Sequence, residues 1–302
     1  MLGVLTKRLL QSALILLGVA AITFVLLYAL PADPARMIAG RSATAQTVAN
    51  IRHELGLDQP LLTQFLHYLR GLLQGDLGRS YAQKTQVVTL IIARLPATLV
   101  LMAAGIFVEV AIGLTLGITA ALNRGGLTDR LVMASAFVGV SAPQFVVALL
   151  LLYLFAATLG WFPMSGYGSF AHVVLPAMTL GILGAGWYAR MARSAMIDVL
   201  NQDYIRTARA KGLSARRIVL RHALPNAILP IIAMIGIDIG QFMGGVVVVE
   251  AVYGWPGIGQ LAWQAIQQVD IPIIMGVTLT SIIGNLVADI IAPMIDPRIR
   301  SH

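Results

Sequence analysis

Long apolar runs separated by short polar stretches dominate this chain. Six of them are close to or longer than the roughly 20 residues that a helix needs to cross the hydrocarbon core of a bilayer. The first run is too long for the core of a signal peptide, so we expect it to remain as a membrane anchor. The pattern predicts an all-α polytopic membrane protein with six transmembrane helices. Within a few residues, these are Leu9–Leu30, Ala97–Leu122, Leu131–Leu159, Val173–Ala189, Ala227–Glu250 and Ile273–Ile295.

Basic residues lie mainly on one side of the predicted membrane. Of the 21 Lys and Arg residues, 14 fall in segments on the same side as the termini, whereas the short connections 160–172 and 251–272 contain none. The positive-inside rule therefore places both termini in the cytoplasm. The chain then divides into an N-terminal tip with the first helix (1–30), a large periplasmic loop (31–96) and a five-helix core (97–302).

Two stretches between the apolar runs have patterns of their own. The run Leu61–Arg70 in the first loop is amphipathic, which predicts a short helix lying near the membrane surface. The cytoplasmic loop at about 190–226 is strongly basic and rich in helix-forming residues. Taken alone, this loop is typical of a solvated segment or of one that faces lipid headgroups.

Composition agrees with a membrane protein and excludes several kinds of catalytic site. Hydrophobic residues make up 58% of the 302 residues and charged residues only 11%, with a mean hydropathy of +0.83 and a net charge of +8. There is no cysteine, so disulfides and thiolate metal sites are excluded. None of the three lysines follows a glycine, which excludes a phosphate-binding loop, and no zinc-protease or serine-hydrolase motif occurs. We therefore expect no enzymatic activity and no ATP-binding site in this chain.

Glu109 lies on a face of small residues in the second predicted helix. Gly105, Gly113 and Gly117 recur with it at every fourth position, a pattern that predicts close helix–helix contact. A charge inside a span is by default a candidate for function. For Glu109, an interhelical hydrogen bond is favoured over a role as a proton relay.

Three further acidic residues lie in or near the spans. Asp238 is rotated about 200° from Gly236, on the side away from the small-residue series Gly236–Gly244, so it faces either lipid or a polar cavity. Lipid is costly for a carboxylate, which leaves a cavity or a partner as the sharper interpretation. Glu250 ends its helix at the outer surface and is expected to be solvated. Asp289, near the cytoplasmic end, is expected to pair locally.

The basic loop carries a recognisable motif. Its segment Asp203–Leu213, followed by Leu224-Pro225-Asn226, resembles the EAA loop of bacterial ATP-binding-cassette importer permeases. The general pattern of that loop is E-A-A-x-x-x-G, with I-x-L-P nine residues later. Ala208, Gly212, Leu224 and Pro225 match it, whereas Arg206, Thr207 and His222 depart from it. The form R-T-A-R-A-K-G is similar to the version in the dipeptide, oligopeptide and nickel importer family.

Other segments along nearly the whole chain resemble the same family and suggest its first, or B-type, permease subunit. Glutathione and nickel permeases of similar length fit as well as peptide permeases do. The matching segments are Leu30–Pro34, Glu54–Pro60, Gly75–Gly78 with Ser80, Glu250–Gly259 and Asp296–Arg300.

The resemblance implies a function and a set of partners. It implies half of the translocation pathway of an ATP-driven importer for di- or oligopeptides in the bacterial inner membrane, with nickel or glutathione as alternative cargo. The implied partners are a second, C-type permease, two ATPase subunits or domains, a periplasmic substrate-binding protein and the lipid bilayer, with no nucleic acid. No cofactor is expected in this chain, because ATP and Mg²⁺ would be held by the ATPase subunits.

The resemblance also implies that the basic loop couples this chain to an ATPase. A short helix would lie across the membrane face and enter a cleft in the ATPase. Ala208 and Gly212 are four residues apart and are expected to share one helical face. Gly212 is also expected to end the helix with a positive φ. The predicted coupling residues are Asp203, Arg206, Ala208, Arg209, Lys211 and Gly212.

On the outer side, Tyr253 and Trp255 precede an amphipathic stretch, Leu261–Val269. Aromatic residues at this depth are commonly interface anchors, whereas the resemblance implies that this turn approaches the substrate. Candidates for the substrate pathway are Asp238, Glu250 and Trp255, and no metal site is predicted. Two alternatives stay open: a proton-coupled secondary transporter that uses Glu109 or Asp238, and a membrane scaffold.

Overall fold

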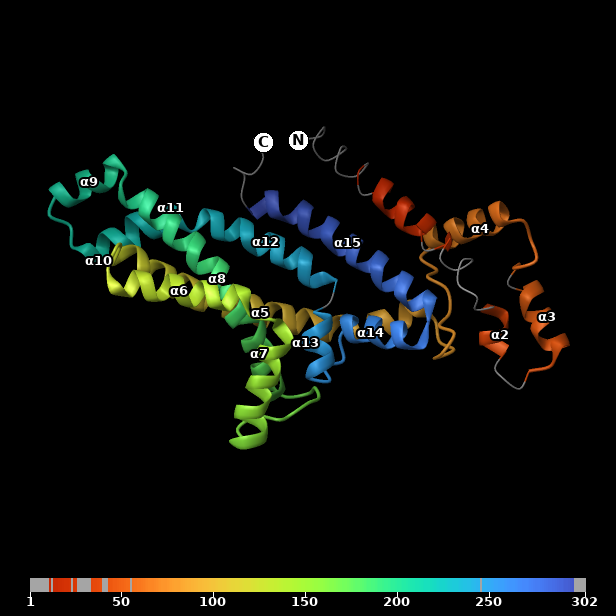
Figure 1. Cartoon of the computed structure of the whole chain (residues 1–302). Helices are drawn as coiled ribbons and strands as arrows, with labels where there is room; N and C mark the ends of the chain where they lie inside the picture. The colour runs from red at the N-terminus through yellow and green to blue at the C-terminus, as the bar shows by residue number, and fades with distance from the viewer. Residues whose placement is uncertain are drawn as a thin grey trace. The chain divides into compact units, whose positions relative to one another are not determined.

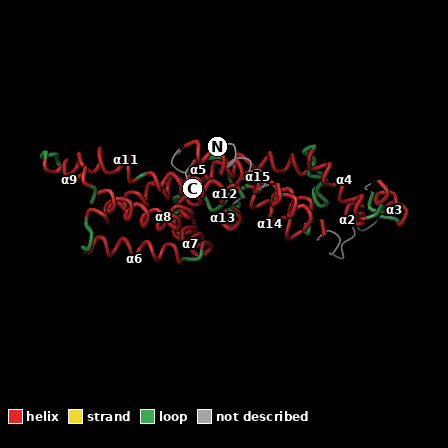
Figure 2. Tube along the Cα trace, turned by 90° about the horizontal axis from the view of Figure 1, so that it is seen from above, coloured by secondary structure: helices red, strands yellow, loops and turns green. Residues whose placement is uncertain are grey.

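The computed structural model describes residues 11, 13–22, 24–25, 34–39, 43–54, 56–244 and 246–295. Over these residues the chain is helical, and the one β-pairing found there is an isolated bridge between Arg79 and Gln86. Figure 2 shows the helices in red and the connections in green. The all-α prediction is confirmed for this part of the chain. Several segments used in the sequence predictions lie outside the described residues: Lys7, Arg8, most of the Leu30–Pro34 motif and the segment Asp296–Arg300.

The chain divides into two compact units. The first comprises Met1–Thr98, Gly244–Val247 and Pro256–Leu286. Its core forms where one face each of α5, α14 and α15 meet, through the side chains Val87, Ile91, Ile258, Leu261, Ala265, Ile273 and Val277. Its helices are α2 (Pro34–Ala39), α3 (Ala45–Glu54), α4 (Leu61–Leu73), the start of α5 (Val87–Leu122), α14 (Ile258–Gln268) and most of α15 (Ile271–Ile295).

A buried carboxylate fastens the loop before α5 within this first unit. Asp270, between α14 and α15, is fully buried and accepts a hydrogen bond of 2.5 Å from the Ser80 hydroxyl. The backbone N–H groups of Tyr81 and Ala82 donate to the same carboxylate, at 3.2 and 3.0 Å. Three donors satisfy a group that would otherwise be costly to bury. The loop residues 80–82 are thereby held beside the start of α15.

The predicted amphipathic helix is confirmed as α4. Leu61, Leu62 and Leu66 are exposed, whereas Phe65 and Tyr68 pack their rings against Phe24. The exposed leucines leave an uncovered apolar strip on this helix. Such a strip suits contact with the interfacial region of a bilayer.

A surface ion pair shifts the titration of its two members in the loop before α4. His53 and Asp58 are 2.6 Å apart between Nδ1 and Oδ2. The hydrogen bond to Asp58 raises the pKa of His53, and the same bond lowers the pKa of Asp58. Both side chains are solvent-exposed, so the pair contributes little to stability.

The second unit comprises Leu99–Met243, Val248–Trp255 and Val287–His302. Within it, α8 contacts α6, α7, α11 and α12, and Figure 1 shows α6 running alongside α8. The remaining helices are α6 (Leu127–Ser141), α7 (Gln144–Leu151), α8 (Phe170–Leu200), α9 (Asp203–Ala210), α10 (Ala215–Arg217), α11 (Leu224–Ala227), α12 (Leu229–Met243) and α13 (Val247–Val252). Two π-helical segments, η1 (Leu152–Thr158) and η2 (Ile218–Ala223), interrupt them.

The third apolar run is not the single continuous helix that its hydropathy predicts. It bends by 102° between α6 and the α7–η1 segment. Ala142 is extended at the bend, with ψ of 132°, and Pro143 follows it. Proline disfavours the helical conformation of the residue before it, so the helix ends there and a new one begins. Hydropathy does not detect this change of direction because apolar residues continue on both sides.

By length and composition, α5 and α8 can each cross a membrane. Two bent pairs also qualify if each pair is one span: α6 with α7–η1, and Ala215–Ala227 with α12. Shorter apolar helices cover Ala13–Ile22 and Ile271–Val287. The described residues thus contain apolar helices at all six predicted positions, two of them already full length.

Candidate functional site

The helix α9 is a short, well-terminated element at the centre of the basic loop. It follows α8 after a two-residue connection. At its end, the Gly212 N–H donates to the Arg209 carbonyl at 2.9 Å, and the Leu213 N–H donates to the Ala208 carbonyl at 3.3 Å. With φ of +77° at Gly212, these bonds form a Schellman motif. The prediction that Gly212 ends the helix with a positive φ is confirmed.

Ala208 faces the body of the chain and is only 6% exposed. It packs in a cluster with Met196 of α8, Ile205, Ile218 and Ala223. The helix ends at Ala210, and Gly212 lies beyond it in the left-handed region. The prediction that Ala208 and Gly212 share one helical face is therefore wrong. Small size at Ala208 lets α9 sit closely on its own chain.

The opposite side of α9 is open to solvent and carries the charged residues of the motif. Arg206 donates to Asp203 at 3.2 Å, and both side chains are largely exposed. Arg209, Lys211 and Tyr204 are also exposed. The aromatic ring of Tyr204 is a contact candidate on this side that the motif-based prediction missed. Exposure of Tyr204 follows from its place next to buried Ile205, which helical periodicity could have indicated.

A cavity of about 420 Å³ lies where the ends of α5 and α8 meet the segment after α9. Apolar side chains form much of its wall, and two guanidinium groups come to it from different elements. Its lining includes Leu122, Arg124, Leu200, Arg209, Leu213 and Val219. Arg209 is therefore exposed on α9 and at the same time forms part of the cavity wall.

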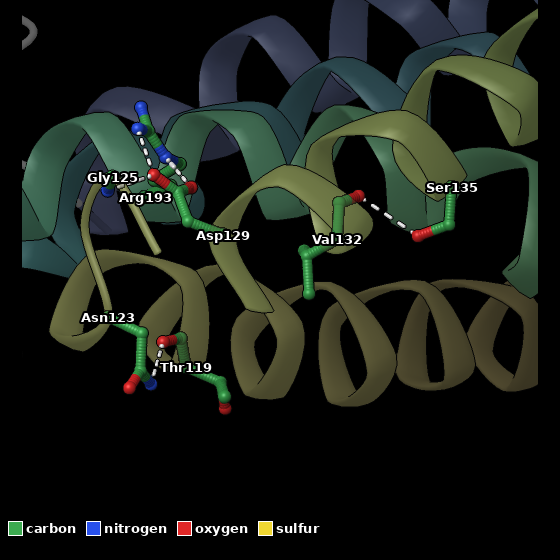
Figure 3. A network of polar contacts seen from close by, with 7 residues as sticks. All are labelled: Thr119, Asn123, Gly125, Asp129, Val132, Ser135 and Arg193. Carbon is green, nitrogen blue, oxygen red and sulfur yellow. Dashed lines mark hydrogen bonds and ion pairs between the residues drawn. The ribbon is translucent and has the colours of Figure 1, made fainter. Parts of the chain in front are cut away.

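An ion pair fastens α8 to the start of α6 near the same end of the unit. Arg193 donates to Asp129 from Nε at 2.5 Å and from Nη2 at 2.7 Å. The Gly125 N–H also donates to Asp129, at 2.9 Å, which ties the α5–α6 turn into the network shown in Figure 3. Asp129 is buried, whereas the Arg193 side chain is partly exposed. The α5–α6 turn, α6 and α8 are thereby fixed to one another two turns before α9.

The small-residue face of α5 lies directly against α8. A Cβ atom added at Gly105 would overlap Leu180, and one at Gly117 would lie 2.5 Å from the Ala189 carbonyl oxygen and 2.7 Å from the Ala192 Cβ. The predicted close helix contact is confirmed. It continues along α8, where Gly184 makes room for the carboxyl group of Glu109.

Glu109, Tyr188 and Asp238 form one polar cluster between three helices of the second unit. The Tyr188 hydroxyl on α8 donates to Oδ2 of Asp238 on α12. The carboxyl groups of Glu109 on α5 and Asp238 interact directly. Glu109 is 4% exposed, and its Oε2 has no hydrogen-bond partner. The sequence predicted an interhelical hydrogen bond for Glu109 and a cavity-facing or partner-facing position for Asp238, but it did not pair the two.

Glu250 and Trp255 both lie in the interior of the second unit. Glu250 is fully buried, so the expectation that it is solvated is wrong. Trp255 is also fully buried, with its ring edge-on to Tyr167 at 4.8 Å. The backbone N–H of Trp255 donates to the backbone carbonyl of Glu250 at 2.8 Å. A buried ring cannot serve as an interface anchor. The turn from Glu250 to Trp255 is therefore a packed structural corner in this conformation.

Tyr253, for which the sequence predicts only an aromatic position near the membrane surface, joins this corner to two helices. Its hydroxyl is hydrogen-bonded to the Thr179 hydroxyl of α8 at 2.8 Å and donates to the Ala148 carbonyl of α7 at 3.2 Å. Its backbone carbonyl accepts from the Gly166 N–H at 3.1 Å. Within the described residues, no group of three or more His, Cys, Asp or Glu side chains is placed to hold a metal ion.

Comparison with known proteins gives matches over the whole chain. Residues 113–301 match the family described as "Binding-protein-dependent transport system inner membrane component", and residues 1–102 match the N-terminal family of the same kind of membrane component. The glutathione transport system permease protein GsiC of Salmonella typhimurium is 43% identical over 304 residues, covering 99% of each chain. GsiC of Escherichia coli strain K12 is 41% identical over the same span.

Two solved structures share the fold. The MetNI methionine ABC transporter in an inward-facing conformation aligns with a TM-score of 0.56 at 20% identity, covering 69% of this chain and 95% of the other. An amino acid ABC transporter with histidines aligns with a TM-score of 0.53 at 17% identity, covering 70% and 94%. At such identity the likeness concerns the fold alone.

Proposed function

This chain belongs to the family of binding-protein-dependent transport system inner membrane components and is a permease subunit of an ATP-binding-cassette importer; we propose that its cargo is glutathione or a similar short peptide. The observation that carries the proposal is the identity of 43% to GsiC over 99% of both chains. Nickel is the alternative cargo within the same family.

We propose six membrane spans with both termini in the cytoplasm of a bacterial inner membrane. The apolar helices at the six predicted positions support the number of spans. The basic residues of α9, α10 and η2 support the orientation, because such residues collect on the cytoplasmic side. The segment 31–96 then lies in the periplasm, with the exposed leucines of α4 toward the membrane surface.

We propose that the exposed side of α9 docks into an ATPase subunit. Arg206, Arg209 and Lys211 provide positive charge there, and Tyr204 provides a flat apolar surface. Asp203 positions Arg206 through their ion pair. Ala208 seats α9 on its own chain, and Gly212 sets the angle at which the chain leaves the helix. Movement of the ATPase is then passed to α8 and α12, which flank this segment.

The energy source and the other half of the pathway lie in partner subunits. We propose a second permease of the C type, two ATPase subunits that hold ATP and Mg²⁺, and a periplasmic binding protein that delivers cargo. Asp238, which is half-buried, is the candidate for contact with the pathway. Glu250 and Trp255 support the pathway from behind in this conformation, because both are fully buried.

The test is to purify the chain from its membrane with its bound subunits and to reconstitute the complex in liposomes. We expect ATP-dependent uptake of glutathione or a dipeptide that requires the binding protein, and no uptake of nickel. Gly212→Arg is expected to assemble yet lose the stimulation of ATP hydrolysis by loaded binding protein. Uptake by the chain alone, without ATP and sensitive to an uncoupler, would instead identify a proton-coupled secondary transporter.

A further inference from the structure

Two carboxyl groups meet between apolar helices of the second unit. Glu109 comes from the middle of α5, and Asp238 is the one charged residue of α12. The Tyr188 hydroxyl donates a hydrogen bond to Oδ2 of Asp238. Glu109 is almost fully buried, and its Oε2 is left without a hydrogen-bond partner. An unsatisfied oxygen of an ionised carboxylate in such a place would be very costly.

Among the residues that the structure describes, no charged group on a neighbouring helix neutralises this pair. The charged or titratable groups found there to interact with Glu109 and Asp238 are the two carboxyl groups themselves and Tyr188. Of the other charged or titratable groups on α5 and α8, Arg94 donates to Gln260 and Gln264, Arg190 stacks on Trp187 at 5.0 Å, Arg193 pairs with Asp129, and His172 is hydrogen-bonded to Ser169. The remaining one, Asp198, lies ten residues along α8 from Tyr188. The elements packed against α8 carry three further basic residues, Arg130 on α6 and Arg221 and His222 on η2. None of these interacts with the carboxyl pair.

Glu109 is buried and Asp238 is half-buried. Ionising both carboxyl groups without a nearby cation is strongly unfavourable, because like charges repel strongly when one of them is shielded from water. Paired carboxyl groups of this kind share a proton between them. A proton on one group also supplies a donor to the pair, which two carboxylates lack.

We infer that Glu109 and Asp238 bind one proton between them, and that this protonated pair, with Tyr188, is a latch that holds α5, α8 and α12 together. The latch joins α8 to α12, the two helices on either side of the α9–α11 segment. Any movement that separates α8 from α12 exposes the pair to water and releases the proton. This inference rests on the proposed coupling role of that segment, since it assigns the latch to the helices that the ATPase moves.

The direct test is difference infrared spectroscopy of the reconstituted permease complex, which resolves the C=O stretch of a protonated carboxyl group. We expect that absorption at neutral pH and its loss on alkaline titration. The double variant Glu109→Gln with Asp238→Asn should lack it. Asp129→Asn is the matched control and should retain it, because that carboxylate is ion-paired with Arg193. Absence of the absorption from the wild-type complex at neutral pH, or its persistence in the double variant, would overturn the inference.

A second measurement detects the latch through ATP hydrolysis, and its wild-type half does not depend on any variant folding well. In wild-type complexes, ATP hydrolysis without binding protein should rise severalfold as alkaline pH removes the proton and the like charges push α5 from α12. The double variant is neutral at every pH and should lack this rise, so that only the pH dependence of the ATPase itself remains. Identical profiles, or a response that follows sodium concentration instead of pH, would contradict the latch. Failed glutathione uptake with the infrared signal intact would reject the proposed cargo and leave the proton site standing.

Discussion

Arg193 on α8 and Asp129 on α6 are joined by two hydrogen bonds, of 2.5 and 2.7 Å. The Gly125 backbone adds a third bond to the same carboxylate. Because α8 continues for only seven residues beyond Arg193 before α9 begins nearby, this network fixes the base of the coupling segment. A bidentate guanidinium–carboxylate pair has a defined geometry, so it holds an angle as well as a distance.

Removing one member of this pair should loosen the base of the coupling segment. Asp129→Ala leaves the Arg193 guanidinium and the Gly125 N–H without their acceptor. We expect a lower midpoint of thermal unfolding in detergent and weaker stimulation of ATP hydrolysis by the binding protein. The exchanged double variant, Asp129→Arg with Arg193→Asp, should recover part of both. If Asp129→Ala behaves like wild type in both measurements, the pair has no such role.

Gly212 provides a test of backbone conformation alone. Its φ is +77°, and a Cβ atom built on it would meet no atom within 4 Å. Gly212→Val should therefore cost about 1–2 kcal/mol from the left-handed backbone and misdirect the chain after α9. Gly212→Asn, which tolerates that conformation better, is the matched control and should retain most of the stimulated ATP hydrolysis. Equal losses in both variants would indicate that Gly212 acts by contact with the ATPase instead.

Two alanines in α9 distinguish packing of this helix against its own chain from binding of the helix to the ATPase subunit. Ala208 is buried against its own chain, and Ala210 is exposed. Ala208→Leu should destabilise the isolated chain by about 1–3 kcal/mol through overpacking. Ala210→Leu should leave the stability of the isolated chain unchanged and act only on binding of the ATPase subunit. Thermal unfolding of the isolated chain and co-purification of the ATPase distinguish the two. A stable Ala208→Leu chain that fails to bind the ATPase would show that Ala208 faces the partner.

Gly117 tests the contact between α5 and α8. A Cβ atom there would lie 2.5 Å from a backbone oxygen of α8, so Gly117→Ala must push the two helices apart. We expect a loss of stability of about 1–3 kcal/mol, as for other overpacked sites. Gly18→Ala is the control, because a Cβ atom at Gly18 meets nothing within 4 Å. The midpoints of thermal unfolding should fall for Gly117→Ala and not for Gly18→Ala; the reverse order would contradict the packing described.

The sequence predicted the helices well because hydropathy reports burial in lipid or protein directly. It placed the end of the fourth helix at Ala189, whereas α8 continues to Leu200. The polar residues that seemed to end the helix have partners that only the fold supplies: Arg190 stacks on Trp187, and Arg193 pairs with Asp129. A residue-by-residue scale counts these arginines as solvated, so it ends the helix too early.

The candidate site was less predictable because its residues come together from distant parts of the chain. Glu109 and Asp238 stood out singly as charges in apolar runs, but their contact depends on how α5 and α12 pack around Tyr188. The motif indicated that Ala208 is small to allow close contact with the ATPase. A small residue equally allows close contact within one chain, as it does here. Burial of Glu250 depends on the corner that Tyr253 and Trp255 build, which the helical pattern does not encode.

The close contact of α5 with α8 also sets an order of events during synthesis. The α6, α7 and η1 segments lie between them in the chain, so about 70 residues must be made after Gly117 before Ala189 exists. At roughly 5–20 residues per second, that takes on the order of 4–14 seconds. Throughout this interval the small-residue face of α5 has no α8 to meet. Nascent α5 must therefore be sheltered by lipid or by the insertion machinery during these seconds.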